Sequence, residues 1–386
     1  MSEKREKTNK KFMLLSAIGI FMVVDHHTFT AFNLLGDYIP YNSFFMPMFV
    51  FISGYFNKVD NTTDIWAYTK KKIKNLLLPY LGISLFVFAV QQLIDLLKTG
   101  EGPSLPSGYM LYVLERVITV GSPFPMAAPI WFVISLFTLL ITYMLIKKLL
   151  YKIWNSYVMF GLSCVLSMLV VLLTHIAGPD SFYWFLLPLK CLFFLPFLEL
   201  GIIYREHLEK PHTGLSGGLK TALLFALLLI NVVRTTILPS SYDVAFDSLD
   251  DLSGFTSPYI FTPLISAFTG ILFWLTVVDL IGKPLAESRF INFMSCNTFW
   301  IMGLHILFFN ILNIGLLAVN DHITALPYFD SQAFRESEWY YWEINSNFKA
   351  VYVIMGILGP LGLKWLFDKM ITMLRSKLSK RLYSGK

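Results

Sequence analysis

Charged residues are scarce in this chain. Asp, Glu, Lys and Arg account for 15% of its 386 residues, against about 25% in an average soluble protein. Hydrophobic residues account for 55% and aromatic residues for 16%. This composition excludes an ordinary soluble domain.

Cysteine is also rare. Each of the three cysteines lies in an apolar run, without the C-x-x-C or Cys/His spacing of a zinc site: Cys164, Cys191 and Cys296. A disulfide framework and a structural zinc are therefore not expected, and nothing in the sequence indicates another metal. No internal repeat is visible, so a transporter built from inverted repeats gains no support. We predict a single domain, 1–386, with basic tails at 1–11 and 373–386.

Long apolar runs dominate what the chain does contain. They have roughly the 20 residues that a helix needs to cross a hydrocarbon core about 30 Å thick. We place them near 12–33, 39–57, 76–97, 129–149, 155–176, 184–204, 219–238, 258–281, 292–318 and 348–372. The first run follows a basic segment, as in a secretory signal, but it contains ionisable residues and lacks a small-residue cleavage site. The sequence thus predicts an all-α, polytopic membrane bundle of about ten transmembrane helices.

Lysine and arginine alternate between the connections. Starting from the basic N-terminal tail, every second connection is basic, whereas 239–257 and 319–347 are acidic. Because cytoplasmic connections concentrate Lys and Arg, both termini should be cytoplasmic. The formal net charge of +6 then indicates membrane lipids with anionic headgroups as partners, and no nucleic acid is expected.

Three outer connections are long, namely 98–128, 239–257 and 319–347. Among them they contain Pro, Gly, Ser and several aromatic residues, which suits ordered caps over a cavity better than free linkers. We expect them to shape an extracellular acceptor site.

The strongest local signal is Asp25-His26-His27 inside the first apolar run. Ionisable groups within a bilayer are costly and usually face a cavity or one another, so they are functional candidates. Imidazole, with an unperturbed pKa of about 6.5, can take a proton from a hydroxyl at neutral pH. Helix neighbours point about 100° apart, so one histidine should be catalytic and the other supporting, with Asp25 orienting the base. The alternative is that these residues simply meet water at the outer interface.

A second signal is His305, which lies in the apolar ninth run. Asn297 precedes it by two helical turns on nearly the same face. We predict that His305 pairs with the first-run histidines and that one of the two ninth-run residues lines the reaction cavity. The alternative is a histidine that packs in the core with its hydrogen bonds satisfied.

The third signal is the basic run KKKIKNLLLPYL, residues 70–81, which includes Lys71, Lys72 and Lys74. Lys71 and Lys74 are three residues apart, so they share a helix face and can present two ammonium groups to phosphates. This arrangement would suit coenzyme A. Ordinary cytoplasmic anchoring of the helix is the alternative explanation.

Weaker candidates for contact with substrate are Trp131 and Glu199. Glu199 and Lys190 share one run, but nine residues separate them and place them on different faces, so no direct pair is expected. Tryptophan is common at membrane interfaces in any case.

Six segments, taken in order, resemble the acyltransferase-3 family of ten-helix integral membrane acyltransferases. They are VVDHHTF, FFMPMFVFISGYF, KKKIKNLLLPYL, APIWFVISLF, CLFFLPFLELGIIYRE and CNTFWIMGLHILFF, within residues 12–310. No single segment is specific; the ordered set is.

The resemblance implies an O-acyltransferase, of the O-acetyltransferase type, in a bacterial cytoplasmic membrane. It implies that acetyl-CoA or another acyl-CoA enters from the cytoplasm and that a carbohydrate hydroxyl on the outer side accepts the acyl group. Residue by residue, His26 or His27 is similar to the family's catalytic histidine, and Lys71 with Lys74 to its basic third-span residues. Trp131 and His305 likewise match a fourth-span tryptophan and a ninth-span histidine.

The chain departs from the family at two points. Many members have an arginine eleven residues before the first-span histidine, where this chain has Leu15 and Ser16. Its third-span basic pair is lysine, which cannot make the bidentate phosphate contacts of arginine. Either Lys10 or Lys11 holds the donor instead, or the chain uses another donor or has lost transferase activity.

Two other classes of function stay open from the sequence. A glycan or lipid transporter, or a flippase, would use the same buried polar groups to bind cargo, and it would move that cargo without acyl modification. A membrane sensor would bind a ligand with its outer connections, and no chemistry would follow.

Overall fold

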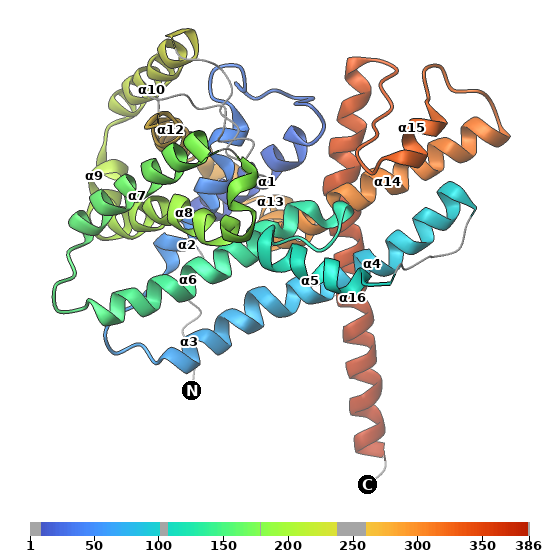
Figure 1. The fold of residues 1–386 in the computed structure, drawn as a ribbon, viewed down its shortest axis with the longest axis horizontal. Helices are drawn as coiled ribbons and strands as arrows, with labels where there is room; N and C mark the ends of the chain where they lie inside the picture. Colours follow the sequence, from blue (N-terminus) through green and yellow to red (C-terminus); the bar gives the residue numbers. More distant parts are fainter. Residues whose placement is uncertain (1–8, 101–106, 178, 238–259, 385–386) are drawn as a thin grey trace.

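A computed structural model describes residues 9–100, 107–177, 179–237 and 260–384. These residues form helices and loops and contain no strand. The helices are α1 (Lys10–His26), α2 (Phe45–Phe56), α3 (Ile65–Lys72), α4 (Leu78–Thr99), α5 (Tyr109–Thr119), α6 (Trp131–Leu149), α7 (Ser156–Ala177), α8 (Leu186–Ile203), α9 (Glu209–Gly214), α10 (Gly217–Ile237), α12 (Thr262–Ala286), α13 (Arg289–Cys296), α14 (Thr298–His322), α15 (Ser331–Glu336) and α16 (Lys349–Ser384). Figure 1 shows their arrangement.

An all-α membrane bundle is confirmed. In the described part of the chain, eight helical stretches are long and apolar enough to cross a membrane. They are Ile65–Thr99, Pro125–Leu149, Ser156–Ile176, Phe182–Gly214, Gly217–Ile237, Thr262–Gly282, Thr298–His322 and Lys349–Ser376. The exact count of ten is not confirmed, because the first two expected runs fold as the shorter helices α1 and α2, of 17 and 12 residues.

The backbone conformation after α1 accounts for the short first helix. After α1, the backbone takes positive φ at Phe29, Thr30, Asn33 and Leu35, which no helix tolerates. The expected run at 12–33 therefore ends in an irregular outer loop. The expected third run differs in the other direction, since α3, a π-helical turn over Ile73–Leu77 and α4 form one continuous helix.

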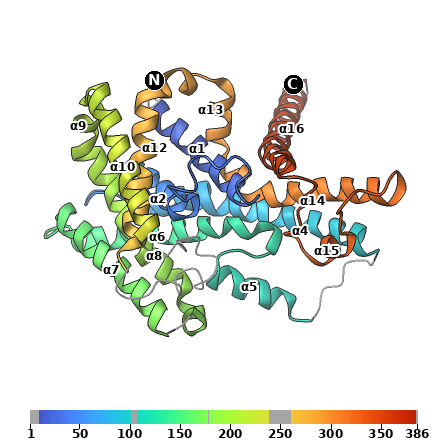
Figure 2. The same cartoon turned by 90° about the horizontal axis from the view of Figure 1, so that it is seen from above.

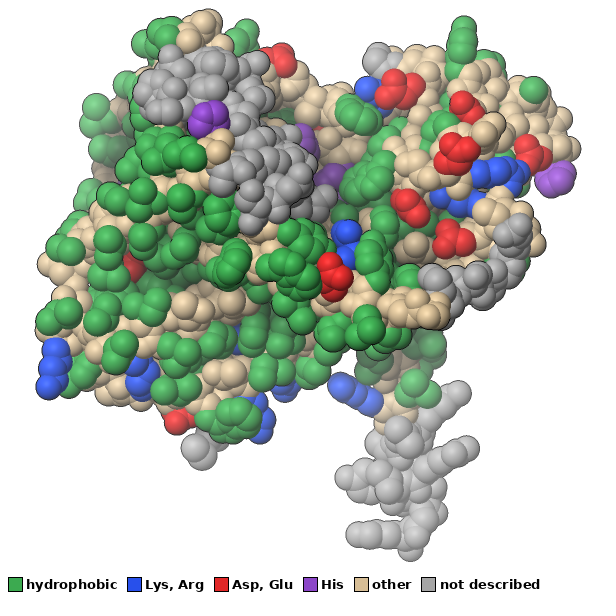
Figure 3. Space-filling model, viewed as in Figure 1, with side chains coloured by type: hydrophobic (Ala, Val, Ile, Leu, Met, Phe, Trp, Pro, Cys, Tyr) green, Lys and Arg blue, Asp and Glu red, His purple; other side chains and the backbone are tan. Residues whose placement is uncertain are grey.

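Charged side chains are distributed unevenly over the molecule. The end of α16 lies at the bottom of Figure 1. Figure 3 shows Lys and Arg side chains along this lower edge, and most of the Asp and Glu side chains of that face at the upper right. This separation of charge follows the alternation seen in the sequence, and we call the two sides the basic side and the acidic side.

Two of the long connections predicted as caps are ordered where they are described. Residues 319–347 include α15, which packs against α4, and the 98–128 connection includes α5. The third, 239–257, lies outside the described residues.

Helix α1 lies among α2, α12 and α13, against which it packs, and it also contacts α14 and α16 (Figure 2). Most of its side chains are buried. The sequence-distant α14 thereby comes next to the outer end of α1.

Helices α2 and α8 cross at very short range because glycine stands at the crossing. A Cβ on Gly54 would lie 2.1 Å from the Leu198 carbonyl oxygen, and one on Gly201 would lie 2.1 Å from that of Phe51. Small residues permit this approach between membrane helices. The crossing fixes the end of α8, and hence Arg205, against the end of α2.

Candidate active site

The side chains of His27 and His305 meet at the outer end of α1. His305 Nε2 lies 3.3 Å from His27 Nδ1, and the two ring centroids are 4.9 Å apart. His305 is fully buried, whereas His27 is partly exposed. The pair joins residues 278 positions apart in the sequence. The predicted pairing of the ninth-run and first-run histidines is therefore present.

The surrounding carbonyls assign the tautomer of each ring. His27 Nδ1 lies 2.7 Å from the Val23 carbonyl oxygen, and His305 Nδ1 lies 2.9 Å from that of Ile301. A carbonyl oxygen only accepts, so each Nδ1 carries the hydrogen and each Nε2 carries a lone pair in the neutral ring. His305 Nε2 can then accept from His27 Nδ1. His27 Nε2 is left with its lone pair available as a base.

His26 takes a different position. Its ring centroid lies 5.8 Å from that of His27 and 5.7 Å from that of Phe45 on α2. Among the described contacts, no hydrogen bond joins it to His305. This matches the prediction that adjacent imidazoles on a helix face different directions. The geometry favours His27 as the base and His26 as its neighbour.

Asp25 forms hydrogen bonds with the loop that follows α1. Its Oδ1 accepts a hydrogen bond from Phe32 N at 3.0 Å, and its backbone carbonyl accepts from Thr28 Oγ1 at 2.9 Å and from Thr30 N at 2.9 Å. The carboxylate is buried, and none of its described hydrogen bonds reaches an imidazole. In the structure the Val23 carbonyl orients the His27 ring, and the described hydrogen bonds of Asp25 are made within the outer loop.

A tryptophan from the acidic side covers the pair. The Trp339 ring stacks on His27 at a centroid distance of 5.9 Å and an interplanar angle of 27°. Nearby, Phe29 meets Tyr341 edge to face at 5.6 Å. Phe29 and Trp339 are 64% and 38% exposed, and Lys349 Nζ lies 5.3 Å from the Phe29 ring centroid, so part of each aromatic ring is accessible on this side.

Two asparagines of α14 hold this tryptophan in place. Asn310 Nδ2 donates to the Glu338 carbonyl at 2.9 Å, and Asn313 Nδ2 donates to the Tyr340 carbonyl at 2.8 Å. The Tyr352 hydroxyl in turn donates to Asn313 Oδ1 at 2.6 Å. The carbonyls on both sides of Trp339 are thus tied to the helix that carries His305. Asn310, Asn313 and Tyr352 together hold the backbone on both sides of Trp339.

A comparison with protein-family models matches residues 12–342 to the acyltransferase-3 family, described as an acyltransferase domain. The chain belongs to this acyltransferase family. The match covers nearly the whole chain and includes both histidines of the pair and Trp339. Among curated proteins and solved structures, no match is found.

In this acyltransferase, Trp131 lies in the interior. Lys190 Nζ lies 4.3 Å from its ring centroid and donates to the Val120 carbonyl at 2.7 Å. Trp131 also stacks on Phe194. Lys190 therefore contacts the tryptophan ring and a backbone carbonyl.

Glu199 and Asn297 also lie apart from the histidine pair. Glu199 is buried on α8 in the electrostatic field of Lys147 and next to Tyr143, both from α6. Asn297 breaks the expected ninth run into α13 and α14, and its Nδ2 donates to the Phe293 carbonyl at 2.7 Å. Two helical turns, roughly 12 Å, separate it from His305.

The lysine run sits on the basic side. Lys71 and Lys74 are exposed, and Lys72 Nζ lies 5.1 Å from the Tyr68 ring centroid. A π-helical turn begins directly after Lys72, and such turns are frequent at functional sites. Exposed ammonium groups here can meet phosphates on that side of the membrane.

Sequence reasoning did not single out Trp339, Asn310 or Asn313. The sequence does contain a signal for the two asparagines, because both are polar residues in an apolar run just beyond His305. It contains no such signal for Trp339, because the contact of this ring with His27 depends on how the outer connection folds. Among the described residues, no group of three His, Cys, Asp or Glu is placed to hold a metal ion.

Proposed function

We propose that this membrane acyltransferase moves an acyl group from acyl-CoA, with acetyl-CoA as the expected donor, to a hydroxyl of a carbohydrate on the opposite side of the bacterial cytoplasmic membrane. The observation that carries the proposal is the His27–His305 pair, which leaves one imidazole nitrogen of His27 free to act as a base. Membership of the family supports acyl transfer, and the pair supports a hydroxyl as acceptor.

The reaction follows from the protonation state of the pair. His27 Nε2 removes the proton of the acceptor hydroxyl while its oxygen attacks the thioester carbonyl carbon. The tetrahedral intermediate then expels the thiolate, which takes the proton from His27 as the C–S bond breaks. An ester and a free thiol result, and His27 returns to its neutral form.

His305 and Val23 stabilise the charged state between these two steps. When His27 gains a proton on Nε2, its Nδ1–H still points to the Val23 carbonyl and to His305 Nε2. Both partners offer lone pairs to the imidazolium. Removing His305 should therefore slow proton transfer without removing the base.

Donor and acceptor are proposed to approach from opposite sides. Lys71, Lys72 and Lys74 would contact the phosphates of the donor on the basic side, where Lys71 and Lys74 are exposed and Lys72 is partly exposed. A sugar would lie on the acidic side against Trp339 and Phe29, since exposed aromatic faces stack on the apolar face of a pyranose. Trp131, Asn297 and Glu199 stay predictions for substrate contact.

Mass spectrometry of surface glycans tests the proposal. Cells that contain the gene should carry an acyl ester on a glycan that is absent without the gene, and His27→Ala should abolish it. His26→Ala is the matched control, because it removes an imidazole from the same turn and leaves the pair intact. An unmodified glycan whose export depends on the gene would overturn acyl transfer in favour of transport.

A further inference from the structure

A second feature of the molecule lies at the other end of α1. A cavity of about 600 Å³ opens between the start of α1, the end of α2, the residues after α8 and the end of α13. Its lining includes Asn9, Ser16, Tyr55, Lys58, Arg205 and Cys296. Two other cavities in the described part of the chain, of about 390 and 340 Å³, have apolar linings, whereas this one is lined by two cations and several polar groups.

Arg205 is held rigidly at the wall of this cavity. Its Nη1 donates to the carbonyls of Tyr55 and Asn57, each at 2.8 Å, and its Nη2 donates to Glu206 at 2.8 Å. These three bonds use three of the five N–H groups of a guanidinium. The side chain is 20% exposed and lines the cavity, and two of its N–H groups are not used by these three bonds. Lys58, an exposed residue just after α2, adds a second positive charge.

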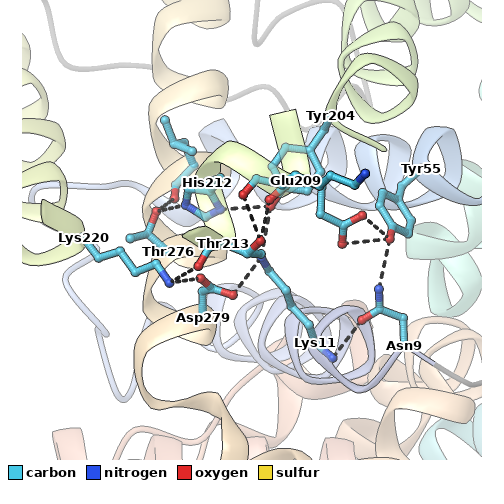
Figure 4. Close-up of polar contacts among 12 residues, drawn as sticks. Asn9, Lys11, Tyr55, Tyr204, Glu209, His212, Thr213, Lys220, Thr276 and Asp279 are labelled. Carbon is cyan, nitrogen blue, oxygen red and sulfur yellow. Dashed lines mark hydrogen bonds and ion pairs between the residues drawn. The ribbon is translucent and has the colours of Figure 1, made fainter. Parts of the chain in front are cut away.

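Lys11, which the sequence offers as a holder of the donor, is committed elsewhere. Its Nζ lies 3.1 Å from Asp279 and donates to the Tyr204 hydroxyl at 3.0 Å. Lys220 contacts the same carboxylate at 2.5 Å, and His212 bridges Tyr204 and Thr276 (Figure 4). This network joins α1 to α10 and α12.

Lys10 is also engaged, because its ammonium pairs with Glu287 at 3.6 Å. The cationic residues in the cavity lining are Lys58 and Arg205, which is also paired with Glu206 at 2.8 Å, and neither lies on α1. Glu209 accepts from the Tyr55 hydroxyl at 2.8 Å, so this nearby carboxylate is bonded to a wall residue.

We propose that this cavity binds the phosphate-bearing end of the acyl donor, with Arg205 and Lys58 as its cationic groups. The inference rests on the proposed function, because it assigns the donor to this end of α1. Ser16 in the cavity wall and His27 are eleven residues apart on one helix, a rise of roughly 16 Å. A donor anchored here must carry its thioester on a long uncharged arm, as coenzyme A does.

The lysine run adjoins the cavity. The Tyr68 hydroxyl donates to Asn57 Oδ1 at 2.9 Å, and the carbonyl of the same Asn57 holds Arg205. Lys72 in turn lies over Tyr68. Hydrogen bonds through Asn57 thus join Arg205 to Tyr68, and Lys72 of the lysine run contacts the ring of that tyrosine. Phosphates outside the cavity would meet the lysines, and the innermost phosphate would meet the guanidinium.

Cys296 provides a direct assay for occupancy. It lines the cavity and is exposed, whereas Cys191 is buried and Cys164 is partly buried on α7. The rate of maleimide labelling can be followed in purified, detergent-solubilised protein, with Cys296→Ser to identify the labelled site. The probe is adenosine 3′,5′-bisphosphate, which carries phosphates of coenzyme A but no thiol. Adenosine is its uncharged control.

Bisphosphate at ten times its dissociation constant should slow labelling of Cys296 roughly ten-fold, and adenosine should not. Arg205→Lys should raise the required concentration about ten-fold, since lysine cannot make the forked contact. Lys58→Gln should raise it roughly two- to five-fold. Lys152→Gln, an exposed lysine in the α6–α7 connection that does not line the cavity, should have no effect.

Three results would overturn the inference. The first is labelling that bisphosphate does not slow, and the second is protection that neither cation variant weakens. The third is protection by short-chain phosphatidylglycerol but not by bisphosphate, which would make the cavity a lipid headgroup site. His27→Ala should keep full protection, so a failure of the proposed chemistry and a failure of donor binding give different results.

Discussion

His27 Nδ1 and His305 Nε2 lie 3.3 Å apart, and each ring also gives its Nδ1 hydrogen to a backbone carbonyl of its own helix. The helix backbones therefore fix both ring orientations before any substrate arrives. Preorganised orientation of this kind lets a base act without rearrangement during the reaction.

Replacement of His305 should slow acyl transfer without abolishing it. His305→Ala removes a lone pair that faces the His27 imidazolium but leaves the Val23 carbonyl in place. We expect kcat to fall roughly 10- to 100-fold, as for residues that support a functional histidine, with KM for the acceptor nearly unchanged. His305→Gln, whose amide oxygen can accept a hydrogen bond, should recover part of the loss. Equal kcat in the unaltered protein, His305→Ala and His305→Gln would show that His305 does not support His27 during the reaction.

Replacement of Trp339 should weaken acceptor binding. The ring stacks on His27 and is 38% exposed, so it offers a face to a sugar beside the base. Trp339→Ala should raise KM for the acceptor about ten-fold, corresponding to roughly 1.4 kcal/mol, and Trp339→Phe should raise it less. Trp365→Ala, which removes an exposed tryptophan of α16, is the control. An unchanged KM for the acceptor in Trp339→Ala would show that the Trp339 ring does not contact the acceptor.

Asp25→Asn tests whether this carboxylate serves the loop or the base. Asparagine keeps an oxygen that can accept from Phe32 N, so the free energy of unfolding should fall by only about 1 kcal/mol. The pH dependence of kcat should keep its shape, because the described hydrogen bonds of Asp25 lie in the outer loop. A pH profile displaced by a full unit in Asp25→Asn would show that Asp25 acts on the histidine after all.

Gly201→Ala tests the crossing that places Arg205. An added Cβ would lie 2.1 Å from the Phe51 carbonyl oxygen, so α2 and α8 must separate. We expect a loss of roughly 1–3 kcal/mol in stability, seen as a lower Tm in detergent. Gly161→Ala on α7 meets nothing within 4 Å and should leave Tm unchanged or raise it. Equal Tm values for the two variants would mean that the crossing is not tightly packed.

Much of the site was visible in the sequence because buried ionisable residues stand out in apolar runs. His27 and His305 both stand out in this way, and their proximity was expected because ionisable groups in a bilayer usually face a cavity or one another. Which of His26 and His27 faces the partner could not be decided. The decision depends on the rotation of α1, which its neighbours α12 and α13 determine.

The outer structure was less predictable. Hydropathy could not show that α1 stops at His26, because the residues that follow remain apolar although their backbone takes positive φ. The tie between Asn313 and the Tyr340 carbonyl spans 27 positions and depends on the fold of a loop. Arg205 was equally hidden, since a basic residue at the end of a helix is what membrane topology alone requires.

Acyl transfer in proteoliposomes, with labelled acetyl-CoA on one side and a glycan acceptor on the other, measures the contribution of each histidine of the first helix. We expect His27→Ala to reduce the rate of labelled ester formation by roughly 10²- to 10⁴-fold, the contribution of a general base, while His26→Ala retains most of that rate. A His27→Ala protein that still forms the ester at the unaltered rate would contradict the assignment of His27 as the base.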